Sequence, residues 1–468
     1  MTELSERAET GWADLLADGR LPRFALICLG IWLNAADTLV TATIMPSVGA
    51  ELGGYAYFSW AVAGFLVGAI LAGASAGRLS EIFGLRLATT IAGLVLTVGC
   101  VLSAAAPDIG FFLVGRLLQG IGCGWIAGFA MVATAVLFPA RHLARVFASI
   151  SGVWGVATVL GPLVGGLFAE SGGWRWVFWL FALQALIFGA AAPFLLKGTV
   201  KSKGQTGVPW LQLVTLGLGV TAISLADTIP QPAITLGLVA LGLVILTLVL
   251  RFDGKAKVRL LPHRASDLTT ICGSGYAALF ALTASSMGLT VYGPAILQTL
   301  RGLSPLMAGY IVGVQALSWT LAAFVVAGVD GGVAEQRWIR RGATCILIGV
   351  ALLALLMQSA PIGFVVAAAA TVGAGFGFSS SLMNRRILGV LADEDRAIGA
   401  SAFIAVRQSG GAVGAAIAGA TANLVGFGAG LTVASAEATA VWVFVTALPM
   451  AIAGFLAAWR LSGSAVQA

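Results

Sequence analysis

The chain has 468 residues, of which 59% are apolar and only 10% are charged, and its mean hydropathy is +0.99. Soluble domains are about 45–50% apolar and about 25% charged, so the composition excludes an ordinary water-soluble globular protein. The formal net charge is +7. The basic residues nevertheless lie in short clusters between apolar runs, without the continuous basic face of a nucleic-acid-binding protein. We therefore expect an integral membrane protein that has the lipid bilayer, and no nucleic acid, as a partner.

Two further features of composition narrow the class. The five cysteines all lie inside apolar runs without metal-ligand spacing, so neither a disulfide framework nor a zinc site is predicted. Residues 1–22 contain five acidic residues, unlike the basic start of a cleaved signal peptide, and the first apolar run should stay in place as an anchor.

Apolar windows predict about fourteen transmembrane helices. In chain order they are 24–48, 57–79, 87–106, 110–137, 146–168 and 176–196; then a pair at 210–229 and 232–250; then 269–297, 305–329, 340–358, 362–384, 397–423 and 438–460. Helices are required because a backbone in lipid must satisfy its own hydrogen bonds, and these runs are too long and too uniform for barrel strands. The predicted fold is therefore an all-α integral membrane protein.

The grouping of the spans predicts two six-helix bundles joined by an inserted transmembrane hairpin. The segments are a cytoplasmic N-terminal segment (1–22), a first bundle (23–197), a cytoplasmic linker (198–208), the hairpin (209–251), a second linker (252–268), a second bundle (269–460) and a cytoplasmic tail (461–468). Two similar halves related by an axis along the membrane normal are typical of some secondary transporters.

The distribution of Lys and Arg predicts the orientation. If the N-terminus is cytoplasmic, the loops on that side hold Arg78, Arg86, Arg141, Arg145, Lys197, Lys201, Lys203, Arg251, Lys255, Lys257, Arg259, Arg264, Arg337, Arg340, Arg341, Arg385, Arg386 and Arg396. The other side keeps Arg175 and Arg301. An even number of spans with both termini in the cytoplasm fits this asymmetry, and the charge bias suggests a multi-pass protein of a bacterial inner (plasma) membrane.

A loop signature follows the second span, where residues 77–86 read GRLSEIFGLR. This pattern resembles the loop signature of the major facilitator superfamily, and it implies gating residues Gly77, Glu81, Gly84 and Arg86. Glycines permit a tight turn, while the acid and the arginines can tie neighbouring helix ends together in one transport state. Glu81 stands where the family usually has aspartate and Leu85 where a basic residue is common, so a loop that serves only topology is the alternative.

Two more motifs of the same family resemble segments in the fourth and fifth spans. Residues 116–122 read RLLQGIG, and an arginine inside a spanning helix needs an acid or a water-filled cavity unless it reaches the headgroups. The fifth span resembles the antiporter motif through Gly155, Gly161, Pro162, Gly165 and Gly166. Pro162 should bend the helix and the glycines should allow close packing. A glycine-rich packing face without influence on transport direction is the alternative.

The first span contains NAADT at residues 34–38 and Met45-Pro46, which is similar to the acidic first-helix motif of fourteen-span drug:proton antiporters. Asp37 lies near mid-membrane, where a carboxylate is expensive and indicates a functional site. Low dielectric favours the neutral acid and a nearby arginine favours the carboxylate, so Asp37 and Arg116 are the predicted proton-coupling pair. A neutral acid that caps a neighbouring helix is the alternative for Asp37.

Candidate cavity residues are polar side chains within spans. They are Asn34, Thr41, Gln119, Gln315, Asn384 and Arg407. Residues 174–178 (WRWVF) and 407–411 (RQSGG) also resemble the fourteen-span group. The tryptophans are most simply part of an interface belt, and for Arg407 a helix-packing clamp and a cavity role both stay open.

The resemblance, which extends from about residue 24 to 460, implies a major facilitator fold and a proton-coupled antiporter that exports amphipathic drugs or related small molecules by alternating access. No P-loop pattern occurs, and no catalytic constellation appears in a soluble segment, so neither an ATP-driven pump nor an enzyme is expected. We expect a monomer without cofactors. The few acids in the membrane favour a cationic substrate. The alternatives are an importer or symporter, an exporter of lipids or metabolites, and a non-transporting sensor.

Overall fold

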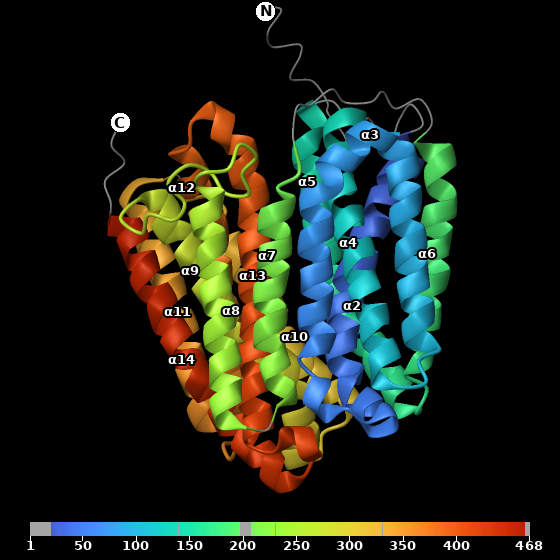
Figure 1. Ribbon diagram of the computed structural model, residues 1–468, viewed down its shortest axis with the longest axis vertical. Helices are drawn as coiled ribbons and strands as arrows, with labels where there is room; N and C mark the ends of the chain where they lie inside the picture. Colours follow the sequence, from blue (N-terminus) through green and yellow to red (C-terminus); the bar gives the residue numbers. More distant parts are fainter. Residues whose placement is uncertain (1–19, 139, 197–206, 230, 330, 464–468) are drawn as a thin grey trace, which may run out of the picture.

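The structure is a computed structural model that describes residues 20–138, 140–196, 207–229, 231–329 and 331–463. Long helices stand side by side along one direction, and the described residues contain no strand (Figure 1). Most of the predicted N-terminal segment, most of the first linker and most of the C-terminal tail lie outside the described residues.

The first bundle contains five continuous helices. They are α2 (Arg20–Leu52), α3 (Trp60–Ala104), α4 (Ile109–Leu137), α5 (Ala140–Glu170) and α6 (Arg175–Leu195). Helix α3 covers both the second and the third predicted span, and its two arms meet at Gly84, whose φ of 77° and ψ of 150° are not helical. Glycine adopts such a backbone conformation without the steric cost that a side chain would add. Gly84 therefore lets the chain turn back between two spans.

The hairpin and the second bundle follow the same pattern. They contain α7 (Trp210–Leu225), α8 (Pro232–Asp253), α9 (Ile271–Arg301), α10 (Pro305–Val325), α11 (Gly332–Leu356), α12 (Ile362–Gly389), α13 (Asp393–Leu424) and α14 (Val433–Gly463). Short 3-10 turns lie at Tyr55–Tyr57, Ala226–Thr228 and Phe427–Ala429. Every predicted span thus coincides with helix.

By length and composition, eleven helical segments among the described residues can cross a membrane, with the two arms of α3 counted as one segment. Helix α7 has only 16 residues, and α13 is less apolar than the others. The total of fourteen crossings therefore stays a prediction. The structure also moves several predicted boundaries. Helix α11 begins at Gly332, so Arg337, Arg340 and Arg341 lie on this helix rather than in a loop. Likewise, α12 continues to Gly389 and α13 begins at Asp393, so Arg385, Arg386 and Arg396 are also helical. Helical hydrogen bonding continues past the apolar stretch because it does not depend on side-chain polarity.

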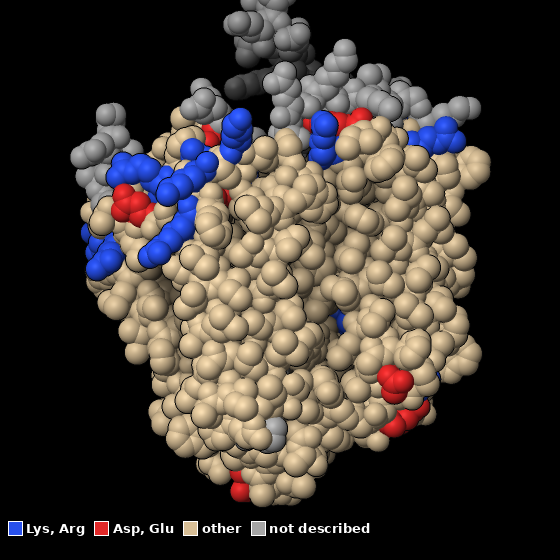
Figure 2. Space-filling view, in the orientation of Figure 1, with Lys and Arg blue, Asp and Glu red and all other residues tan. Residues whose placement is uncertain are grey.

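Basic side chains gather at one end of the molecule, which we call the basic end, whereas the flank in view is almost free of charge (Figure 2). Helix ends at the basic end are tied by arginines. Arg23 Nε donates to the Leu195 carbonyl at 3.0 Å, and Arg340 Nε donates to Ser462 Oγ at 2.7 Å. At the opposite end, Arg175 pairs with Glu51 at 2.9 Å. The two ends of the molecule therefore differ in their content of basic side chains, as the sequence predicts.

The two bundles meet along α13, which packs against α3, and along α10, which packs against α5. At the opposite end they also share an aromatic cluster made of Tyr55, Phe58, Tyr292 and Phe427. The Phe427 ring centroid lies 5.3 Å from that of Phe58 and 5.0 Å from that of Tyr292. Nearby, Asn423 Nδ2 donates to the Ala56 carbonyl at 2.7 Å. The bundles are therefore closed against each other at the opposite end.

The α7–α8 hairpin lies beside α13 and the first arm of α3. The linker that follows it folds back over the buried Asp253, whose carboxylate accepts the backbone N–H groups of Leu260 and Leu261 at 2.6 and 2.9 Å. His263 Nδ1 then lies 2.7 Å from Asp395 at the start of α13. Burial acts to raise the pKa of Asp395, but hydrogen bonds from His263 lower it below its usual value overall. The linker is thus fixed to the second bundle by an ionised carboxylate at neutral pH.

Candidate functional site

Asp37 and Arg116 form an ion pair inside the first bundle. Arg116 Nη1 lies 2.7 Å from Asp37 Oδ2, and each residue is only 1% exposed. Helix α4 begins after Asp108, whose side chain accepts the Phe111 N–H at 3.0 Å. This N-cap fixes the start of α4, so Arg116 lies two turns inside the helix, level with the middle of α2. The structure therefore brings together the two residues that the sequence predicts to form the proton-coupling pair.

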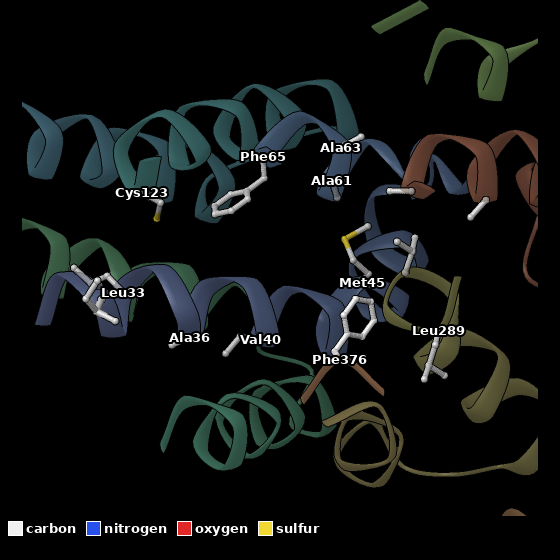
Figure 3. Packing of buried hydrophobic residues seen from close by; sticks show 14 of the residues in the cluster. Leu33, Ala36, Val40, Met45, Ala61, Ala63, Phe65, Cys123, Leu289 and Phe376 are labelled. Atoms are coloured by element: carbon white, nitrogen blue, oxygen red, sulfur yellow. The ribbon is translucent and has the colours of Figure 1, made fainter. Parts of the chain in front are cut away.

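The guanidinium of Arg116 contacts several neighbouring groups besides Asp37. Its Nε donates to the Ala61 carbonyl at 3.1 Å, and its Nη1 also donates to Gln119 Oε1. The guanidinium carbon lies 4.6 Å from the centre of the Phe65 ring. Figure 3 shows this ring pointing from α3 toward α2. The position of Arg116 is thus determined from three sides, as expected for a charge held in low dielectric.

Gln119 acts within this network rather than in a cavity. It is 0% exposed, and its Nε2 donates to the Gly99 carbonyl at 3.0 Å and to Ser103 Oγ at 2.8 Å. A Cβ at Gly99 would lie 2.6 Å from the Gln119 backbone nitrogen, so only glycine allows the second arm of α3 to come this close. Gln119 therefore connects Arg116 to the second arm of α3.

One oxygen of Asp37 is left free. Its Oδ1 is buried without a hydrogen-bond partner among the described residues, whereas Oδ2 faces Arg116. Buried polar atoms are nearly always satisfied, so an exception beside an ion pair indicates a position that can take a proton or a water molecule.

The other two candidates on α2 have different surroundings. Thr41 is buried, and its Oγ1 donates to the carbonyl of Asp37 at 2.8 Å, which binds the hydroxyl to its own helix. Asn34 is partly buried, and its carbonyl accepts the Thr38 hydroxyl at 3.0 Å. Neither side chain joins the ion pair.

The candidates of the second bundle are separate from this pair. Arg407 on α13 lies with its guanidinium 5.8 Å from the centre of the Trp319 ring on α10. Gln315 is one turn before Trp319 and is partly buried, as is Asn384 on α12, whose Oδ1 has no hydrogen-bond partner in the described part of the chain. The structure thus gives two separate polar groups, one in each bundle.

The segment predicted to gate lies where the two arms of α3 meet. Arg78 Nη1 pairs with Glu81 Oε2 at 3.1 Å, and Ser80 Oγ donates to the Gly77 carbonyl at 2.7 Å. Arg86 is exposed beyond the turn at Gly84. The ion pair of Arg78 and Glu81 is local, because the two residues are three positions apart on one helix, and such a pair contributes little at a solvated surface.

Three glycines of α5, at positions 161, 165 and 166, lie at close contacts with neighbouring helices. A Cβ at Gly161 would lie 2.8 Å from Leu39 Cβ on α2, and a Cβ at Gly165 would lie 3.1 Å from the Val40 carbonyl oxygen. A Cβ at Gly166 would lie 2.5 Å from Leu306 Cα on α10, in the other bundle. Pro162 packs beside Gly309 of α10. Gly155, nearer the basic end, has open space around it.

A comparison with protein families decides the class. Residues 27–415 match the model of the Major Facilitator Superfamily. The chain belongs to the major facilitator superfamily. It is therefore a multi-pass membrane transporter and not an enzyme.

Curated relatives of this facilitator include multidrug transporters. A probable multidrug-efflux transporter of Mycobacterium tuberculosis is 29% identical over 440 residues, covering 90% of this chain and 92% of the relative. The multidrug transporter protein MdtP of Bacillus subtilis is 23% identical and covers 85% of this chain and 74% of its own.

Solved structures share the fold. A peptide transporter in complex with sulfate superposes with a TM-score of 0.67 at 16% identity, covering 94% of this chain and 95% of the other. A D-xylose–proton symporter does so with a TM-score of 0.60 at 20% identity, covering 92% and 97%. The facilitator architecture predicted from the sequence is confirmed.

The close contact at Gly166 should control how tightly the two bundles of this facilitator close. Gly166→Val should separate the bundles at the opposite end, because the new side chain meets the Leu306 backbone. Overpacking costs about 1–3 kcal/mol, enough to shift a conformational equilibrium about 5- to 150-fold. A cysteine pair at positions 56 and 428 reports closure, since a Cβ at Gly428 would lie 3.2 Å from the Ala56 Cβ. Oxidative cross-linking of this pair should slow in the Gly166→Val protein.

Gly155→Ala is the matched control, because nothing lies within 4 Å of a Cβ at that position. It should leave the cross-linking rate unchanged. Equal rates in the wild-type and Gly166→Val proteins would show that α5 and α10 separate without resistance from this contact.

Proposed function

We propose that this transporter is a proton-coupled antiporter that exports amphipathic small molecules, with Asp37 as the residue that binds and releases the proton. The observation that supports this proposal is the buried Asp37–Arg116 pair with one carboxylate oxygen left free. The probable multidrug-efflux transporter among its relatives supports export rather than uptake.

The chemistry follows from the two oxygens of Asp37. Oδ2 accepts the hydrogen bond from Arg116, and Oδ1 is the acceptor to which a proton can add. Protonation removes the negative charge and leaves the guanidinium of Arg116 without its counter-charge in a low-dielectric interior. An uncompensated buried charge is costly, so gaining or losing the proton shifts the balance between conformations in which the pair is differently hydrated.

Alternating access connects this event to transport. The bundles are closed at the opposite end through the aromatic cluster and the contact of α5 with α10, and rocking of one bundle against the other would break these contacts. The basic end would face the cytoplasm of a bacterial inner membrane, with both termini on that side. The turn at Gly84, with Gly77, Glu81 and Arg86, would act in the opening of that end. The transporter would work as a monomer, because each bundle pair encloses its own path.

The direction of coupling can be tested in vesicles. A growth-protection panel of varied toxins first identifies an exported compound, with the Asp37→Asn variant as the comparison. Purified protein reconstituted with that compound should then move it uphill toward the acidic compartment as protons leave that compartment. Uphill movement of the compound out of the acidic compartment would instead identify a symporter, and no counterflow of any compound would identify a non-transporting protein.

A further inference from the structure

Arg407 lies in the interior of α13, far from both of its ends. Its guanidinium lies over the Trp319 ring, and this ring stacks on Phe376 of α12 with centroids 5.0 Å apart and an interplanar angle of 15°. Three helices of the second bundle thus present a cation followed by two stacked aromatic rings. A charge placed this deep in a membrane protein indicates a functional site.

No carboxylate compensates this cation. Within the ranges that the structure describes, Arg407 makes no hydrogen bond and no ion pair. The sequence extends this to the whole membrane region, since Asp37 is the only acidic residue in the twelve predicted spans of the two bundles. Asp37 is already paired with Arg116. The middle of the molecule therefore holds two cations against one anion.

Arg407 and its neighbour Trp319 belong to helices of the second bundle that contact the first bundle. Helix α13 packs on α3 and helix α10 packs on α5, so a contact from Arg407 to Trp319 spans the region between these two inter-bundle seams. Phe376 belongs to the same apolar cluster as Val40 and Met45, and Figure 3 shows its ring beside the stretch of α2 that carries them. In an alternating-access transporter this region is the substrate path.

We propose that the substrate of this transporter is an amphipathic organic anion, whose carboxylate, sulfonate or phosphate pairs with Arg407 while its ring packs against Trp319 and Phe376. A guanidinium binds such oxyanions through two parallel hydrogen bonds, and aromatic faces favour a flat apolar body. This inference rests on the proposed function only in taking the space between the bundles as the substrate path. It reverses the sequence-based expectation of a cationic substrate, because the charge of the one membrane acid is already balanced by Arg116.

The charge of the substrate determines whether the membrane potential contributes to the driving force for export. Export of a monovalent anion carries one negative charge out of the cell, which is electrically equivalent to moving one positive charge in. Uptake of one proton moves a second positive charge in. Each exchange would therefore be driven by the membrane potential as well as by the pH gradient. Moving one elementary charge is worth about 2.3 kcal/mol per 100 mV, so a potassium-diffusion potential alone should support uphill export of an anion.

Binding to the purified protein tests the proposal without any transport step. Two probes share one ring and differ in the sign of charge: 2-naphthalenesulfonate and trimethyl(2-naphthyl)ammonium. Calorimetric titration, corrected for binding to empty micelles, should show tighter binding of the sulfonate by at least about tenfold, which corresponds to about 1.4 kcal/mol. Arg407→Gln should remove this preference, and Arg407→Lys should retain part of it.

Arg341→Gln is the matched control. It removes the same charge from a guanidinium that lies 4.9 Å over the Trp338 ring, but at the basic end of α11, and it should leave the preference intact. Competition by dihexanoyl phosphatidylglycerol distinguishes a lipid headgroup from a free organic anion as the occupant. Tighter binding of the ammonium probe, or an equal loss of both probes in Arg407→Gln, would overturn the proposal. The binding experiment uses no proton gradient, so its result does not depend on whether transport is coupled to protons.

Discussion

Replacing Asp37 with asparagine should abolish uphill transport driven by a pH gradient, while energy-independent exchange of substrate continues. Asparagine has nearly the same shape and can still accept the Arg116 hydrogen bond through its amide oxygen, but it does not titrate. The protein should fold and rock between states without a requirement for the proton. Proteoliposomes loaded with the compound identified by the toxin panel give both readouts, accumulation under an imposed pH gradient and counterflow without one.

Glu51→Gln is the control for this experiment, since Glu51 is also an acid of α2 paired with an arginine. Partial burial acts to raise the pKa of Glu51, but hydrogen bonds from Trp174 and Arg175 lower it overall below the usual value of about 4.3. Its ionised form therefore stabilises the folded state at neutral pH, and this contribution is lost only as the pH falls through the lowered pKa. Glu51 cannot exchange protons near neutrality, and Glu51→Gln should keep coupling. Full pH-driven accumulation by Asp37→Asn would refute the role of Asp37.

Arg116→Lys should lose coupling and also stability. A lysine ammonium is compact, so it cannot donate at once to Asp37, the Ala61 carbonyl and Gln119 as the guanidinium does. Breaking a buried ion pair from one side typically costs about 3–5 kcal/mol. Thermal unfolding of the purified protein in detergent should therefore begin at a markedly lower temperature in Arg116→Gln, with Arg116→Lys between that variant and wild type.

A double variant separates the charge from the packing. Asp37→Asn combined with Arg116→Gln leaves no uncompensated charge, so it should recover part of the stability that Arg116→Gln loses. Its coupling should stay absent. If the double variant were no more stable than the sum of the two single variants predicts, the pair would not stabilise the folded protein as the 2.7 Å contact indicates.

The fold could be predicted from the sequence because lipid imposes one rule on every span. Apolar runs of sufficient length must be helical, and the helices from α2 to α14 lie where those runs were found. The sequence did not reveal how far the helices extend past the apolar runs. Arg340, for example, lies on α11 and reaches Ser462 on α14, a contact between distant segments that no local pattern encodes.

The candidate site could be predicted only in its charged members. Asp37 and Arg116 carry a strong signal, because a charged side chain within a span is energetically costly and indicates a functional site. The groups that hold Arg116 carry none: Ala61 contributes a backbone carbonyl, and Phe65 is one apolar residue among many. Ser103 is a small polar residue near the end of a span, which is common in membrane helices. Such partners become visible only when helix packing brings them together.

The expectation of a cationic substrate is also based on the sequence without knowledge of which charges are paired. Counting acids in the spans gives Asp37 as a possible partner for a cation, but the structure shows its Oδ2 engaged by Arg116. Arg407 is the charge that stays without a counter-ion among the residues described. Net charge in a transport path therefore depends on which charges are already paired, and pairing is a property of the fold.

Distance measurements on one labelled pair test the central role of the Asp37 proton. Spin labels at Ala105 and Val433, exposed residues near the opposite end of each bundle, report whether that end is closed. Across about pH 5 to about pH 9, the distance distribution should shift with a single titration in the wild-type protein, because one carboxyl group controls the balance between conformations. In Asp37→Asn the distribution should be independent of pH. The same shift in Asp37→Asn, or no shift in the wild-type protein, would contradict this mechanism.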